Sequence, residues 1–334
     1  MTFFLAIQNP YSGQDFFSFF FVMMQRMFFF LSGNGAEGLA SDEIQCLVLI
    51  LLGLSLAFLG SFLVLKQMTM LANALSHTLL LGIVIAFLLL HSLLGLNSLS
   101  EPFTSMKVLW TAALITGLLT TVLTQLLTEG FRVQEDASIG LVFTTLFALG
   151  IVFVTLFTRN MHLGVEAIMG NIDALHVSDV GASWKFAAVM FFFYVFFFRG
   201  FFASAFDPLF AKSLGWPIQL LNYILMVLTA GGAISSFRAV GVLLFLAFLV
   251  GPVLIARLYT HSLKKLIALS FSVSALCSLF SVALSRHILT VYKAPVSTAG
   301  LAVTCLFVFY LVALLFAPKK GFLVLGKKRI LHSK

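Results

Sequence analysis

The sequence has few charged residues and lacks the motifs of a soluble catalytic domain. Only 10% of its 334 residues are charged, whereas soluble domains average about 25%. It contains no GxxxxGK[ST] loop, so it does not bind and hydrolyse a nucleotide through a P-loop of its own. The HExxH and GxSxG motifs of metalloproteases and serine hydrolases are also absent. We therefore expect a protein that is not an enzyme and that takes its energy from a partner or a gradient.

Cysteines and carboxylates are scarce, and their positions exclude further classes. Cys46, Cys277 and Cys305 all fall in apolar runs without CxxC spacing, which indicates small buried side chains rather than a disulfide framework or a zinc knuckle. None of the 12 acidic residues falls inside the apolar core of a clear candidate span. A secondary transporter driven by an ion gradient normally needs a protonatable carboxylate there, so this alternative is disfavoured.

Apolar residues dominate the chain instead. They make up 61% of the sequence, and the mean hydropathy is +1.10. Soluble domains are only about 45–50% apolar, so the sequence predicts an all-α integral membrane protein. Marking runs of about 18 apolar residues or more gives a polytopic bundle of eight to ten transmembrane helices. The candidate spans are 16–31, 44–65, 69–95, 108–128, 137–158, 183–202, 217–235, 238–258, 266–285 and 297–317.

Two of these assignments stay open. The first run is short and contains Arg26, so it is either an interfacial helix or an extra span. The runs 217–235 and 238–258 are divided only by Ala230-Gly231-Gly232 and by Arg238, so they are either two spans or two broken helices.

The basic residues predict topology rather than nucleic-acid binding. The net charge of +8 comes from lysines and arginines scattered singly at the ends of apolar runs, with a cluster only near the C-terminus. Because cytoplasmic loops carry the excess of basic residues, we expect a cytoplasmic C-terminus. The expected organisation is an N-terminal segment with a polar linker at 1–43, a transmembrane domain at 44–318 and a basic cytoplasmic tail at 319–334.

The stretch from Gly60 to Gly82 places polar residues where a spanning helix should be apolar. Asn73 and His77 are four residues apart, so they share one face of a helix. If that helix begins near Thr69, His77 lies about 12 Å along it, close to the middle of a hydrocarbon layer about 30 Å thick. An imidazole at this depth indicates either a transport or ligand site, or a hydrogen-bonded contact between helices. The residues alone leave both interpretations open.

A short helix is predicted in the loop at 203–216. Asp207 is placed as its N-cap, Pro208 as its first residue and Gly215 just beyond its end. A capped helix on the cytoplasmic surface is suited to docking another protein, although the capping signals alone favour a plain connecting turn.

A polar external stretch follows at 159–179. His162 and Glu166 are four residues apart and form either a metal-receiving station, a contact for a binding protein, or a pair of solvated side chains.

Several segments, taken in order, resemble the membrane permease subunits of ABC importers for zinc, manganese and iron. The likeness covers roughly residues 55–290. Its segments are GSFLVLKQMTMLANALSHTLLLGI from Gly60, EDASIGLVFTTLFALGI at 135–151, MHLGVEAIMGNI at 161–172, DPLFAKSLG at 207–215 and RAVGVLLFLAFLVGPVLIARL at 238–258.

This resemblance implies an importer of the bacterial inner membrane. It implies two permease chains, forming a homodimer or a heterodimer with a paralogue, together with cytoplasmic ABC ATPase subunits and an extracytoplasmic metal-binding protein. It also implies that the divalent metal is cargo and that no cofactor is bound stably. Docking of the ATPase is expected at Asp207, Ala211 and Gly215. An ABC permease for a metal chelate, such as haem or a siderophore, is the nearest alternative.

The resemblance gives His77 a role as a metal contact on the transport path. The family usually has an aspartate four residues before this histidine, whereas this chain has Asn73. An amide offers a neutral oxygen where a carboxylate would offer charge, so we expect looser metal binding, completed by a second chain.

Overall fold

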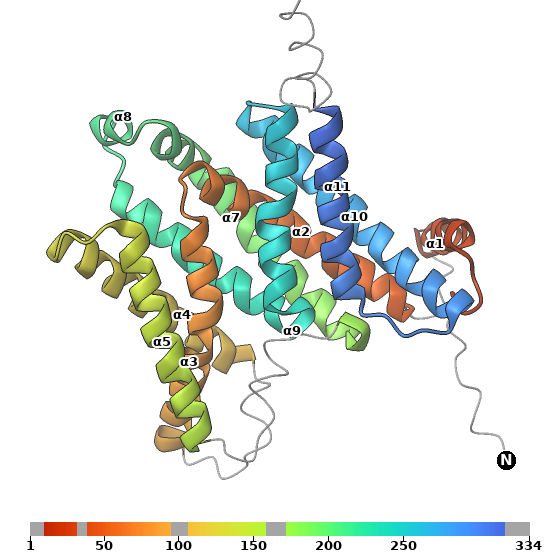
Figure 1. The fold of residues 1–334 in the computed structure, drawn as a ribbon, viewed down its shortest axis with the longest axis horizontal. Helices are drawn as coiled ribbons and strands as arrows, with labels where there is room; N and C mark the ends of the chain where they lie inside the picture. The colour runs from red at the N-terminus through yellow and green to blue at the C-terminus, as the bar shows by residue number, and fades with distance from the viewer. Residues whose placement is uncertain (1–9, 32–38, 95–105, 158–171, 318–334) are drawn as a thin grey trace, which may run out of the picture. The chain divides into compact units, whose positions relative to one another are not determined.

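The computed structural model describes residues 10–31, 39–94, 106–157 and 172–317 (Figure 1). The chain divides into two compact units. Unit 1 comprises 1–57, 171–187 and 247–334, and unit 2 comprises 58–170 and 188–246. All regular elements within the described ranges are helical. The predicted all-α class is therefore confirmed.

The helices follow the apolar runs of the sequence. Their bounds are α1 (Phe16–Leu31), α2 (Ser41–Leu65), α3 (Thr69–Leu94), α4 (Met106–Gln125), the π-helix η1 (Leu126–Gly130), α5 (Glu135–Phe157), the 3₁₀-helix η2 (Ile172–Ala174), α7 (Val177–Phe206), α8 (Pro208–Ser213), α9 (Ile218–Tyr259), α10 (Leu263–Tyr292) and α11 (Thr298–Phe316).

Seven segments of the described chain are long and apolar enough to cross a membrane. They lie in α2, α5, α7, the two halves of α9, α10 and α11. Helices α3 and α4 match two more of the predicted spans but contain side chains outside the described set. The expected number of eight to ten spans therefore stays a prediction.

The predicted runs 217–235 and 238–258 correspond to two candidate spans of α9, Ile218–Ser236 and Ala239–Tyr259, but Gly231 and Gly232 do not interrupt the helix. The backbone stays helical through Ala230-Gly231-Gly232, and the non-helical position is Gly241, with φ 73° and ψ 172°. A positive φ costs glycine little because glycine has no Cβ, so the chain changes direction at this residue. The internal proline, Pro252, lies within the second half of α9.

In unit 2, α3 packs on both α4 and α5 (Figure 1). Lipid is as apolar as leucine, so membrane helices associate through close packing and small residues. A Cβ on Gly82 would lie 1.5 Å from Thr116 Oγ1, and a Cβ on Gly150 would lie 3.1 Å from the backbone nitrogen of Leu81. The two glycines thus allow α4 and α5 to approach α3 closely.

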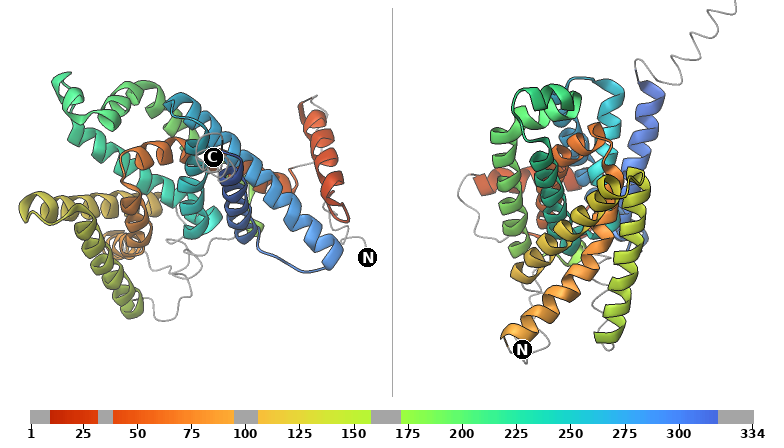
Figure 2. Two further views of the ribbon diagram at one scale, coloured as in Figure 1. Left: turned by 45° about the horizontal axis from the view of Figure 1, so that its top comes forward. Right: turned by 90° about the vertical axis from the view of Figure 1, so that its left-hand side faces the viewer.

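In unit 1, α10 packs on α11, and α1 packs on α10 (Figure 2). Helix α10 carries a row of fully buried serines at Ser270, Ser274, Ser278 and Ser281. A Cβ on Gly53 of α2 would lie 2.6 Å from Ser274 Oγ, so these two helices also meet at small residues.

Ion pairs tie together the helix ends of unit 1. Arg286 of α10 pairs with Asp42 of α2 at 2.5 Å, and Arg26 of α1 pairs with Glu43 at 2.6 Å. Asp42 and Glu43 lie in the first turn of α2, where the helix dipole also favours negative charge. Helix α10 continues to Tyr292, beyond the predicted limit of 285, and Arg286 in this extension makes the pair with Asp42.

Candidate functional site

Asn73 and His77 lie on α3 as predicted, and both side chains are half-buried. The His77 ring packs on two phenylalanines of α5, with centroid distances of 5.3 Å to Phe143 and 5.6 Å to Phe147. These rings fix one side of the imidazole and leave part of its surface accessible. The side chain of Ser76, which precedes His77 in the sequence, lies outside the described set.

The face of α3 that carries this pair continues to an exposed methionine. Met70 is three residues before Asn73 and is 61% exposed. Residues 70, 73 and 77 follow the three- and four-residue spacing of a single helix face. This face of the isolated chain is therefore partly open, with an amide, an imidazole and a thioether along it.

The neighbouring turn of α3 faces α4 instead. Thr120 Oγ1 of α4 donates a hydrogen bond to Thr78 Oγ1 at 3.2 Å, and both residues are buried. Helix α3 is thus held on one side by hydroxyl contacts and on the other by aromatic rings. Its rotation about its own axis is set by packing, which fixes the direction of Asn73 and His77.

Asn73 and His77 offer one neutral oxygen and one imidazole nitrogen. Imidazole is a suitable ligand for zinc, manganese and iron, but two neutral ligands do not complete a metal site. Among the described residues, there is no group of three His, Cys, Asp or Glu side chains that could hold a metal ion. His162 and Glu166 lie outside the described residues. A metal at Asn73 and His77 would need further ligands from water or another chain.

A half-buried lysine precedes α3, and the sequence pattern did not reveal its role. Lys66 lies in the turn between α2 and α3, and its Nζ donates a hydrogen bond to Asn222 Oδ1 of α9 at 2.6 Å. Burial lowers the pKa of Lys66 to about 8. On the next residue of α9, the Tyr223 hydroxyl donates to Gln125 Oε1 of α4. The only signal in the sequence was a single lysine between two apolar runs.

The predicted short helix at 207–215 is present as α8. Asp207 is its N-cap, with Oδ1 accepting a hydrogen bond from the Phe210 backbone nitrogen at 3.0 Å, and Pro208 occupies the first turn. Gly215 follows the helix with a φ of 81°, which is the left-handed conformation that favours glycine at a helix end. Ala211 is fully buried.

The outer surface of α8 is apolar and exposed. Leu209 is 81% exposed, and Phe210 and Leu214 are each 56% exposed. On the inner side, the Trp216 backbone nitrogen donates to the Ala211 carbonyl, and the indole packs on Gly200 of α7. A Cβ on Gly200 would lie 2.9 Å from Trp216 Cε3. Helix α8 is therefore anchored to unit 2 while presenting three apolar side chains outward.

Comparisons with known proteins agree with this geometry. The family model of the ABC 3 transport family matches residues 44–317. A probable metal transport system membrane protein of Chlamydia trachomatis is 39% identical over 325 residues, covering 97% of this chain and 99% of that protein. The manganese transport system membrane protein MntD of Bacillus subtilis is 36% identical over 292 residues, covering 84% of this chain and 92% of that protein.

A solved structure is also similar. PsaBC from Streptococcus pneumoniae, in complex with a Fab, matches with a TM-score of 0.70 and 26% identity, covering 88% of this chain and 98% of that chain. The expected resemblance to ABC permeases is confirmed, and the chain belongs to the ABC 3 transport family.

Proposed function

We propose that this chain is the permease subunit of an ATP-binding-cassette importer that moves a divalent transition metal ion across the bacterial inner membrane. The ion is zinc, manganese or iron, and it is cargo rather than a resident cofactor. The observation that carries this proposal is the match over nearly the whole chain to a metal transport system membrane protein. The manganese transport protein of Bacillus subtilis favours manganese among the three metals.

The transport path runs past Asn73 and His77 on α3. A bare divalent cation does not cross hydrocarbon, so protein ligands must replace water at each stage of the path. The two neutral ligands form a low-affinity site, so the ion can dissociate again. A second permease chain, either an identical copy or a paralogue that keeps an aspartate at this position, completes the ligand set.

Helix α8 is the docking element for a separate ATPase. Its exposed Leu209, Phe210 and Leu214 supply the contact surface. Asp207 caps its start, Ala211 fixes it to unit 2, and Gly215 ends it. ATP hydrolysis in the partner moves α8 and switches the bundle between outward and inward access.

The hydrogen bond between Lys66 and Asn222 links α8 to the transport path. Asn222 lies in the first turns of α9, shortly after α8, and Lys66 lies three residues before α3. Displacement of α8 therefore reaches α3 through one turn of helix and one hydrogen bond. All of these residues belong to unit 2.

The remaining assignments follow from the family and the charge distribution. The transmembrane domain is 44–318, with eight to ten spans, preceded by the N-terminal segment 1–43 and followed by the cytoplasmic tail 319–334. An extracytoplasmic metal-binding protein delivers the ion, and His162 and Glu166 form its receiving station.

Reconstitution tests this proposal. Proteoliposomes that contain the permease and its ATPase, with ATP enclosed on the ATPase side, should accumulate Mn²⁺ supplied outside together with the metal-binding protein. They should not do so when a non-hydrolysable analogue replaces ATP. Uptake that needs only a proton or sodium gradient would contradict the proposal.

A substitution at Asn73 tests its proposed role as a ligand. Asn73→Asp places a carboxylate beside the imidazole, so we expect tighter Mn²⁺ binding by the purified transporter, measured by calorimetry. Asn73→Leu is the control and should weaken binding. Equal affinity in all three proteins would remove Asn73 from the path.

A further inference from the structure

We propose that α1 does not cross the membrane but lies in the plane of one membrane surface, with an aromatic stripe inserted at the boundary between lipid headgroups and acyl chains. This inference concerns the N-terminal segment and does not depend on the transport site.

One face of α1 is apolar and exposed from Phe17 to Phe28. Phe17 is 84% exposed, and Phe21, Met24 and Phe28 are each 73% exposed. Their spacing of four, three and four residues places them on a single face of the helix. This stripe contains no charged residue, so nothing on it requires contact with water.

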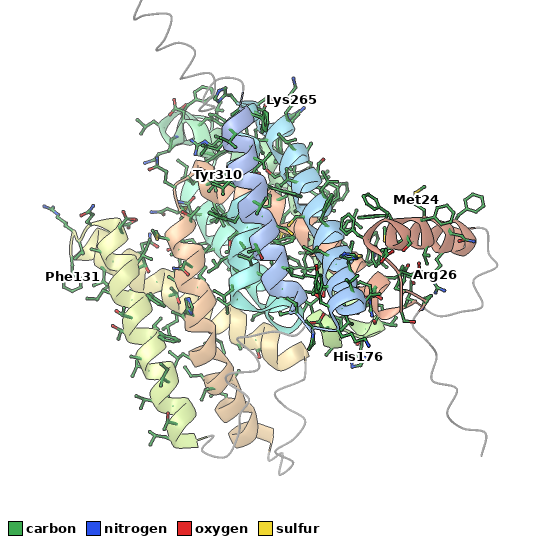
Figure 3. All side chains as sticks on the ribbon, turned by 45° about the vertical axis from the view of Figure 1, so that its right-hand side comes forward. Met24, Arg26, Phe131, His176, Lys265 and Tyr310 are labelled. Atoms are coloured by element: carbon green, nitrogen blue, oxygen red, sulfur yellow. The ribbon has the colours of Figure 1, made fainter. Side chains whose placement is uncertain are left out.

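The opposite side of α1 is fixed to α10 and α2. The Phe16 ring lies 5.6 Å from the Phe280 ring and 6.5 Å from the His287 ring of α10. Arg26, the single charged residue of α1, donates from its Nε to Glu43 Oε1 at 2.6 Å. Figure 3 shows Met24 and Arg26 on opposite sides of the helix. The charge is therefore turned toward the protein, and the stripe is turned away.

The charged residues of α10 indicate the depth of α1 in the membrane. Lys265 and Arg286 are 21 residues apart, which is about 31 Å along a helix and close to the thickness of the hydrocarbon layer, about 30 Å. Phe280 and His287, which contact α1, lie on either side of Arg286 in the sequence. Helix α1 is thus attached where α10 leaves the hydrocarbon at its Arg286 end.

The direction of α1 also fits a surface position. Figure 3 shows that the axis of α1 runs crosswise to that of α10, near the end of α10 opposite Lys265. A spanning helix at this place would have to run roughly parallel to α10. With the cytoplasmic C-terminus proposed above, the surface involved is the extracytoplasmic one.

Lipid is the occupant that the surroundings favour. Leu276 and Phe280 of α10 are 52% and 40% exposed and continue the apolar surface beside α1. Interfacial helices insert their apolar face about 5–10 Å into the boundary region, which suits side chains of this size.

Electron paramagnetic resonance measures the depth of this stripe. Nitroxide labels are placed on Phe17→Cys and Phe28→Cys in nanodiscs, and depth is read from the ratio of accessibility to oxygen and to a Ni²⁺ chelate. The two positions are 11 residues apart, so they differ in depth by about 16 Å if α1 crosses the membrane. We expect equal, shallow depths, and labels on Phe21→Cys and Met24→Cys should agree with them.

A matched pair on α11 calibrates the measurement. Val308→Cys and Phe316→Cys are both exposed in the parent and lie eight residues apart, so on a spanning helix their depths differ by about 12 Å. Cys46 and Cys277 are buried, and Cys305→Ser removes the third native thiol. A difference of about 16 Å between the α1 labels, or shielding of both labels from both reagents by a protein partner, would overturn the inference.

Discussion

The two units of the chain use polar residues in opposite ways. In unit 1, acidic residues at the start of α2 form ion pairs with Arg26 and Arg286, and the Asp42 side chain is only 4% exposed. In unit 2, the polar residues of interest on α3 are the neutral pair Asn73 and His77. Unit 1 holds its charged side chains in ion pairs, whereas unit 2 has two uncharged polar side chains on a partly open face of α3.

This difference in polar residues suggests a structural role for the ion pairs of unit 1 and a transport role for α3 of unit 2. A buried ion pair fixes the position of its helices because removing one partner is costly. A neutral amide and imidazole bind a cation weakly enough to release it. We infer that the pairs of unit 1 hold the helix ends in place while α3 of unit 2 handles the ion.

The largest effect is expected from removing the ion pair between Arg286 and Asp42 in unit 1. Arg286→Met removes a guanidinium from the buried carboxylate of Asp42, and the free energy of unfolding should fall by about 3–5 kcal/mol. Denaturant unfolding in detergent measures the change. The double variant Asp42→Leu/Arg286→Met should recover much of the loss, and Lys264→Met, at an exposed position, is the control. A single variant as stable as the parent would show that this pair is not structural.

The second prediction concerns the link between α8, the proposed docking helix, and α3. A hydrogen bond from a charged donor contributes about 1.5–3 kcal/mol, so Lys66→Met should lower Mn²⁺ uptake by about tenfold or more. The ATPase should stay bound and active, because α8 is unchanged. Asn222→Leu should have the same effect, and the double variant should be no worse than either single one.

Lys185→Met, at an exposed position, is the control for that prediction. Unchanged uptake in Lys66→Met would place the coupling route elsewhere in unit 2.

The smallest effect is expected from removing the N-cap of α8 in unit 2. Asp207→Ala removes an N-cap worth about 1 kcal/mol, so binding of the ATPase should weaken by about fivefold. A pull-down or calorimetric titration measures the affinity. Asp136→Ala, an exposed carboxylate on α5, should leave binding unchanged. Equal binding by both variants would argue against α8 as the docking element.

Local signals in the sequence predicted local structure well. The N-cap at Asp207, the end at Gly215 and the shared face of Asn73 and His77 all depend on residues a few positions apart. Apolar runs likewise placed most helices to within a few residues, because a spanning helix must be continuously apolar.

Contacts between distant residues could not be predicted in this way. Arg286 and Asp42 are 244 residues apart, and Lys66 and Asn222 are 156 apart. A charged residue at the end of an apolar run indicates a helix limit, so the sequence predicts a span that ends at 285, whereas α10 continues through Arg286 to Tyr292. The break in α9 falls at Gly241, three residues after Arg238, and not at the glycine pair.

Uptake of radioactive Mn²⁺ by cells carrying His77→Ala tests the central claim most directly. His261→Ala, at an exposed position between α9 and α10, is the matched control. We predict that His77→Ala loses uptake while the ATPase still copurifies and that His261→Ala transports normally. Uptake by His77→Ala at the rate of the parent would contradict a path along α3.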